Sequence, residues 1–145
     1  MQSASSDGPQ ILVVDDDAEV SAVVRRLLVE LEKARPFRAD VTCALSARQA
    51  LEFANKRKFD IFVVDLKLPD RESDRDPRAA VGRRLLSLLI QKPNSGIIVY
   101  SSEPKDRKAG EYLLLGADDF IQKTDGSEFL VEKIYALWRR VKSKQ

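Results

Sequence analysis

Acidic, hydroxyl and amine side chains follow four short apolar runs of the chain, each at the point where a run ends. The runs lead into Asp15–Asp17, Asp65, Ser101 and Lys123. Neighbouring carboxylates raise one another's pKa unless a cation joins them. Mg²⁺ takes oxygen ligands of this kind, and magnesium, a hydroxyl and a lysine together suit the oxygens of a phosphoryl group. We expect Lys123 to have no acid beside it until a phosphoryl group is brought.

Composition excludes several other kinds of chemistry. The chain of 145 residues has no histidine and one cysteine, Cys43. This excludes a Ser-His or Cys-His nucleophile pair, a disulfide framework and a zinc site of the usual Cys/His kind. The 25 basic and 23 acidic residues are mixed along the chain, so we expect no direct nucleic-acid binding.

The length predicts one domain. No apolar run approaches the roughly 18 residues that a membrane span needs, so we expect no membrane insertion. Residues 1–9 are polar and small, have no apolar region of a secretory signal, and are expected to form a disordered leader. We therefore expect a cytoplasmic protein.

Strand and helix patterns alternate along the chain. The expected strands are residues 11–14, 39–43, 61–64, 97–100 and 119–122, which are short and rich in β-branched or aromatic residues. Helical patterns separate them. Asp17 is the expected N-cap of the first helix, Ser46 and Gln49 form a capping box for the second, and Gly116 follows the end of the fourth.

The burial expected of each strand limits the strand order. The first, third and fourth runs are apolar throughout, as in strands buried on both faces, whereas the second and fifth are mixed and look like edges. The order 2-1-3-4-5 satisfies this pattern. We predict an α/β, flavodoxin-like doubly wound (βα)5 fold with helices on both faces and a ligand crevice between strands one and three.

Four motifs, in this order and spacing, resemble the receiver domain of bacterial two-component response regulators, the CheY-like family. They are ILVVDD at 11–16, DIFVVDLKLP at 60–69, IIVYSS at 97–102 and GADDFIQK at 116–123. The resemblance implies one receiver domain over residues 10–142, with a charged insertion at about 70–80 and a tail at 143–145.

The resemblance also implies a role for each site residue. Asp65 would accept the phosphoryl group, Ser101 and Lys123 would bind its oxygens, and Ser101 with Phe120 would form the conformational switch. Phe120 is equally interpreted as an ordinary core residue of an edge strand. The implied Mg²⁺ ligands are Asp16 directly, Asp15 largely through water, Asp65, and the backbone carbonyl of Lys67.

The implied function is that of a phosphoacceptor in a two-component phosphorelay. The donor would be the phosphohistidine of a histidine kinase or histidine phosphotransfer protein, and the output would reach a downstream protein through the face made by the fourth helix, fifth strand and fifth helix. The chain would not be an enzyme, although intrinsic self-phosphorylation and autodephosphorylation are expected. The absence of histidine suits a recipient whose partner supplies the donor.

Three departures from the family pattern stand out. Thr124 follows Lys123 where many receivers have proline, which puts the backbone beyond Lys123 in question. Ser101 replaces the commoner threonine. Residues 70–78 carry seven charged residues, and Gly82 comes late; this insertion is interpreted either as a solvated segment or as a partner-recognition loop.

Lys67 and Glu103 are each two residues beyond a site residue. We expect both to flank the mouth of the site, and we hypothesise that they pair across it and hinder the water that attacks the acyl phosphate.

Two other functions are considered. A haloacid-dehalogenase-type phosphatase would use Asp15 as its nucleophile, although Ala18 departs from that family's pattern and little room exists for a cap. A receiver-like interaction module would never be phosphorylated. We expect no output domain after the fifth helix, and the chain is either a stand-alone receiver or a piece of a longer protein.

Overall fold

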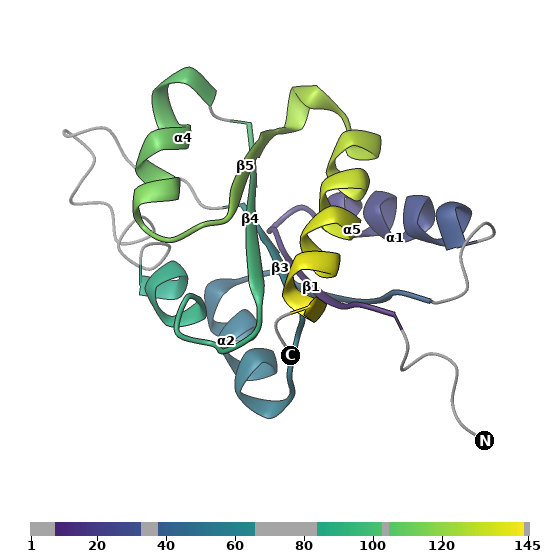
Figure 1. Ribbon diagram of the computed structural model, residues 1–145, viewed down its shortest axis with the longest axis horizontal. Coiled ribbons are helices and arrows are strands. Elements are labelled where there is room, and N and C mark those ends of the chain that lie inside the picture. The colour runs from purple at the N-terminus through teal and green to yellow at the C-terminus, as the bar shows by residue number, and fades with distance from the viewer. Residues whose placement is uncertain (1–7, 33–37, 66–83, 103–104, 144–145) are drawn as a thin grey trace.

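The computed structural model describes residues 8–32, 38–65, 84–102 and 105–143 (Figure 1). The strands are β1 Gln10–Val14, β2 Asp40–Ala44, β3 Ile61–Val64, β4 Gly96–Ser101 and β5 Asp119–Gln122. The helices are α1 Ala18–Glu32, α2 Ala47–Lys56, residues 84–89, α4 Lys105–Leu114 and α5 Ser127–Ser143, with a 3-10 turn over Lys123–Asp125. Each predicted strand is therefore present, with bounds that differ by one residue at most.

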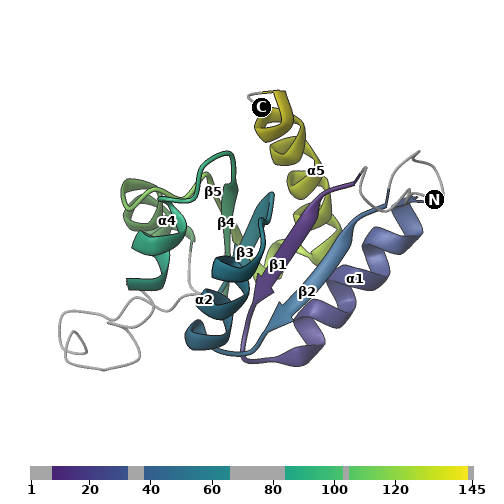
Figure 2. The ribbon, with the colours of Figure 1, turned by 90° about the horizontal axis from the view of Figure 1, so that it is seen from below.

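The five strands form one parallel sheet in the order β2-β1-β3-β4-β5, which confirms the predicted topology. Helices α1 and α5 lie on one face, and α2 and α4 lie on the other (Figures 1 and 2). Two apolar clusters, one on each face, make the core. The sheet is thus doubly wound, and the helices bury both of its faces.

Burial along the strands explains why their order could be predicted. All four residues of β3 and all six of β4 are buried, because helices cover both faces there. The edge strand β5 is buried only at its two middle residues, and β2 begins with an exposed residue.

Two arginines lie against the outer edge strand β2. The guanidinium of Arg25, on α1, donates to the carbonyl oxygen of Val41 at 2.9 Å. The guanidinium of Arg57, at the end of α2, donates to the hydroxyl of Thr42. A backbone acceptor and a side-chain acceptor of this edge strand therefore already have partners.

The helix caps largely follow the sequence predictions. Asp17 accepts the N–H of Glu19 at 3.0 Å and caps α1. The backbone N–H of Gln49 donates to Ser46 Oγ at 3.1 Å, as a capping box requires. The reciprocal bond differs from the prediction, because the Gln49 side chain accepts the N–H of Leu45 at 2.7 Å.

The last two residues of the predicted leader lie within the described part of the chain. Gly8 and Pro9 are buried, and the carbonyl oxygen of Pro9 accepts the N–H of Asp40 at 2.9 Å. The chain therefore contacts β2 before β1 begins. Residues 1–7 and the charged insertion at 70–80 lie outside the described residues, and α5 extends to Ser143, the first residue of the predicted tail. Within the described ranges, no helix combines the length and apolarity needed to cross a membrane.

Helix α5 approaches the sheet closely at Gly96, the first residue of β4. A Cβ atom added there would lie 2.6 Å from a methyl carbon of the Leu137 side chain and 2.7 Å from its branching carbon. Leu137 is itself buried. Only a residue without a side chain therefore allows this packing.

We predict that Gly96→Ala lowers the free energy of unfolding by about 1–3 kcal/mol, the usual cost of overpacking a core. Urea denaturation measures the loss. Gly110→Ala is the matched control, because nothing lies within 4 Å of an added Cβ there. Alanine suits a helix better than glycine, so this control is expected to be neutral or stabilising. Equal stability of Gly96→Ala and the unsubstituted protein would contradict the packing argument.

Candidate functional site

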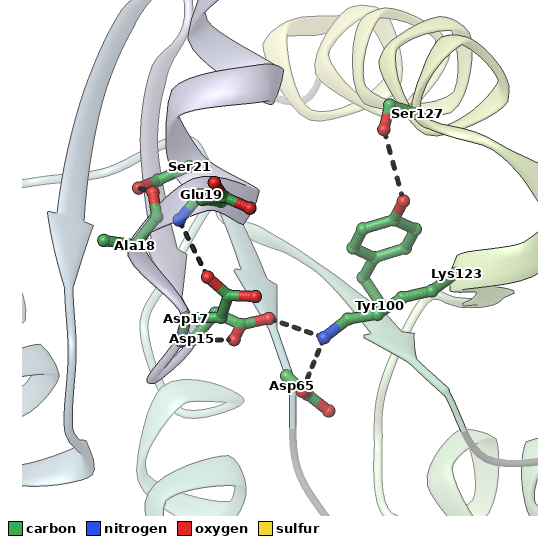
Figure 3. Close-up of polar contacts among 9 residues, drawn as sticks. All are labelled: Asp15, Asp17, Ala18, Glu19, Ser21, Asp65, Tyr100, Lys123 and Ser127. Atoms are coloured by element: carbon green, nitrogen blue, oxygen red, sulfur yellow. Dashed lines mark hydrogen bonds and ion pairs between the residues drawn. The ribbon is translucent and has the colours of Figure 1, made fainter.

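One ammonium group joins two carboxylates at the carboxyl edge of the sheet (Figure 3). Lys123 Nζ lies 2.8 Å from Asp65 Oδ2 and 2.9 Å from Asp15 Oδ2. The three side chains follow β5, β3 and β1 respectively. The expectation that Lys123 has no acid beside it is therefore wrong, because both carboxylates are within reach of its flexible stem.

The parallel register brings these residues together. Val14 pairs with Val64, so the residues that follow them, Asp15 and Asp65, come out side by side. The N–H of Asp65 donates to the carbonyl of Val14 at 2.9 Å. The side chain of Asp15 is held further by the N–H of Asp17, which donates to Oδ1 at 2.9 Å. Both carboxylates are thus positioned before any ligand arrives.

The site is nearly closed to water around the carboxylates. The side chains of Asp15 and Asp65 are 3% and 9% exposed, and that of Lys123 is 25% exposed. Burial alone would lower the pKa of Lys123, but hydrogen bonds to Asp65 and Asp15, together with their charges, raise it above its ordinary value. The lysine is therefore cationic throughout the neutral range.

Ser101 on β4 and Phe120 on β5 lie toward the α2 and α4 face of the sheet. Ser101 ends β4 and is fully buried. Phe120 is buried in the cluster on that face, and its ring stacks on that of Tyr112 with centroids 5.3 Å apart. Phe120 is therefore a core residue in this structure, and its role as a switch stays a prediction.

The predicted metal ligands are only partly brought together. Asp15 and Asp65 converge, whereas Asp16 is exposed and Lys67 lies outside the described residues. Among the residues that the structure describes, no group of three acidic or other metal-binding side chains is assembled. Two buried carboxylates with hard oxygen donors nevertheless fit magnesium chemistry, with Asp16 adjacent in sequence to supply a third.

Two contacts of Lys123 were not foreseen from the sequence. Its ammonium lies over the ring of Tyr100, 6.0 Å from the ring centroid. Its backbone begins the 3-10 turn, which Asp125 closes by accepting the N–H of Gln122 at 3.0 Å. The three-residue spacing of Gln122 and Asp125 was the available signal for this capping box. Thr124 lies within this 3-10 turn, and the peptide bonds of the described part of the chain are trans.

The hypothesis that Lys67 and Glu103 pair across the mouth stays untested, since both lie outside the described residues.

We predict that Lys123→Met lowers the free energy of unfolding at neutral pH by about 1–3 kcal/mol, because two neighbouring carboxylates lose their shared cation. The folded-state pKa of Lys123 is raised, so the lysine contribution is complete below the ordinary lysine pKa near 10.4. It is lost only as the pH rises through the higher folded-state pKa.

Urea denaturation at several pH values measures this difference, with Lys58→Met as the control, because Lys58 is exposed and lies outside the site. A Lys123→Met protein as stable as Lys58→Met at pH 7 would show that the bridge contributes nothing.

Comparison with known proteins agrees with this geometry. The family model described as the response regulator receiver domain matches residues 11–135. Two-component response regulator ORR21 of Oryza sativa is 29% identical over 140 residues, which are 95% of this chain and 18% of that protein. A protein-glutamate methylesterase/protein-glutamine glutaminase of Archaeoglobus fulgidus is 31% identical over 122 residues, 81% of this chain and 30% of that protein. The chain thus spans less than a third of these relatives.

Solved structures give the same result over nearly the whole chain. A CheY-like response regulator receiver domain protein from Methanospirillum hungatei has a TM-score of 0.72 at 25% identity, covering 95% of this chain and 99% of that one. The receiver domain of the Francisella response regulator 1452 has a TM-score of 0.71 at 25% identity, covering 92% and 98%. The chain therefore belongs to the response regulator receiver domain family of two-component systems, whose standard function is that of a phosphoacceptor.

Proposed function

We propose that Asp65 is the phosphoacceptor of this receiver domain and that a histidine kinase or histidine phosphotransfer protein supplies the phosphoryl group. One observation carries the proposal: Lys123 Nζ binds both Asp65 and Asp15 at the switch point between β1 and β3. Ligands of open α/β sheets bind at this point.

The transfer exchanges one bond to phosphorus for another. A carboxylate oxygen of Asp65 forms a bond to phosphorus while the bond between phosphorus and the donor's imidazole nitrogen breaks. The nitrogen keeps the electron pair, and because the other ring nitrogen of the donor carries a proton, a neutral imidazole leaves and an acyl phosphate stays on Asp65. Lys123 lies 2.8 Å from the acceptor carboxylate and is placed to neutralise charge on the phosphoryl oxygens.

We propose that Mg²⁺ is held by Asp15, Asp16, Asp65 and the backbone carbonyl of Lys67. When bound, it supplies positive charge that offsets the carboxylates and the phosphoryl oxygens. The Ser101 hydroxyl is placed at the end of the neighbouring strand to donate to a phosphoryl oxygen.

Signal output would follow from the new charge. The phosphoryl group carries roughly −1.5 to −2 charge, so Ser101 and Lys123 gain a strong new partner. Their movement, with that of Phe120, would bias a bistable face made by α4, β5 and α5 toward a downstream protein.

Replacement of Asp65 by asparagine is expected to abolish phosphoryl transfer. The protein is incubated with Mg²⁺ and phosphoramidate, a small donor with a P–N bond like that of phosphohistidine, and then with candidate kinases. Intact-mass spectrometry measures the adduct. Asp40→Asn, an exposed aspartate at the amino end of β2, removes the same charge and is expected to be phosphorylated normally.

The alternative functions predict different results in the same experiment. A phosphatase that uses Asp15 would keep its adduct in Asp65→Asn, lose it in Asp15→Asn, and turn over a generic phosphate ester. An interaction module would give no adduct in any variant. Either result would overturn the proposal.

Asp15→Asn is expected to weaken Mg²⁺ binding by about 10–100-fold, because it removes a charged oxygen that would hold the ion, largely through water. Isothermal titration calorimetry of the unphosphorylated protein measures this, with Asp40→Asn as the control. An unchanged affinity in Asp15→Asn would remove Asp15 from the ligand set.

A further inference from the structure

Tyr100 lies directly before Ser101 in β4 but on the opposite face of the sheet. Its side chain is buried in the cluster covered by α1 and α5, whereas alternation along the strand directs Ser101 toward the α2 and α4 face. Its ring and its hydroxyl each contact a different element. The ring lies under the Lys123 ammonium, and the hydroxyl oxygen is 3.5 Å from Ser127 Oγ (Figure 3).

The ring face gives the ammonium a third contact. Lys123 Nζ already reaches Asp15 and Asp65, and the aromatic ring attracts a cation within about 6 Å of its centroid. Such attraction grows as water is removed, and the Lys123 side chain is three-quarters buried. The ring therefore limits the positions that a long, flexible lysine stem otherwise samples.

The Tyr100 hydroxyl contacts helix α5 through Ser127. Ser127 is the first residue of α5, so Tyr100 connects the charged group of the site with the start of the helix that covers one face of the sheet. The Ser101 and Phe120 pair lies on the other face. A displacement of Lys123 thus has a separate route to α5 through Tyr100.

We propose that Tyr100 is a positioning residue: its ring holds the Lys123 ammonium at the two carboxylates, and its hydroxyl couples that ammonium to the first turn of α5. The first half stands on the unphosphorylated structure alone. The second half, a change at α5 on activation, rests on the proposed function.

The first half is tested without any phosphoryl group. Nuclear magnetic resonance of the Lys123 side chain, in ¹⁵N-lysine-labelled protein, reports how tightly its ammonium is held. Tyr100→Leu is expected to broaden or shift this resonance toward that of an exposed lysine, whereas Tyr100→Phe keeps the ring and leaves it in place. Tyr135→Phe is the matched control. Tyr135 is a buried tyrosine of the same cluster and lies on α5, about two turns after Ser127.

A change limited to Tyr100→Leu supports the ring contact. An unaltered Lys123 resonance in a folded Tyr100→Leu protein overturns it. If Tyr100→Leu does not fold, Tyr100→Trp keeps a ring face in a larger side chain and is expected to hold the resonance. A resonance like that of an exposed lysine in a folded Tyr100→Trp protein also overturns the ring contact.

The second half uses Mg²⁺ with beryllofluoride as a phosphoryl mimic. We expect the Ser127 amide resonance to shift on activation of the unsubstituted protein, and this shift to be lost in Tyr100→Phe while the Phe120 resonance still shifts. Ser127→Ala is expected to abolish the change of the neighbouring Glu128 amide to the same extent as Tyr100→Phe, with no further loss in the double variant.

Phosphorylation by phosphoramidate separates the two halves. Tyr100→Leu is expected to slow adduct formation by about two- to fivefold, the size of one cation–π contact, and Tyr100→Phe to leave it unchanged. If the double variant Tyr100→Phe, Ser127→Ala loses more of the Glu128 amide shift than either single variant, the coupling is overturned. Absence of any Phe120 shift in the unsubstituted protein counts against the proposed function, while the Lys123 resonance still decides the ring contact.

Discussion

The ion pairs of Lys123 with Asp15 and Asp65 are the interaction on which the site depends. Two carboxylates that emerge side by side from neighbouring strands repel each other, and the partly exposed ammonium of Lys123 offsets that repulsion. The sheet imposes this arrangement, because parallel strands end at one edge and the register of β1 with β3 leaves no other place for the two aspartates. The order β2-β1-β3-β4-β5 then brings Lys123 within reach from the end of β5.

This arrangement makes the resting site self-neutralising in part. Three charged groups leave one net negative charge where the two carboxylates are largely buried, and this charge suits a divalent cation. The site lies at the carboxyl edge of the sheet, between the two faces that the helices cover. Phe120 lies in the cluster on the α2 and α4 face and Tyr100 in the cluster on the α1 and α5 face, while Ser101 and Tyr100 are consecutive residues of β4 that point to opposite faces.

Sequence reasoning succeeded where one physical variable dominated. Continuous apolar runs mark strands that are covered on both faces, and this pattern identified β2 and β5 as the edges, which the order of the flavodoxin-like fold satisfies. The convergence of Asp15, Asp65 and Lys123 followed from that order. The ion-pair partners of Lys123 could not be predicted in this way. Its side chain is long and flexible, so the positions of the nearby charges in three dimensions decide which of them it contacts. The contact of Tyr100 with Lys123 was not foreseen for the same reason. Gln49 bonds Leu45 rather than Ser46 because neighbouring N–H groups compete for one side-chain oxygen.

The arginines on β2 have a consequence for the behaviour of the molecule in concentrated solution. An open sheet ends in a strand whose outer polar groups invite pairing with another chain, and such pairing leads toward fibrous or amorphous precipitates. Arg25 and Arg57 take acceptors of this strand and leave positive charge along it. Two molecules that approached edge to edge along β2 would therefore meet like charge and, at Val41, a backbone acceptor that is already taken, which disfavours pairing at this part of the edge.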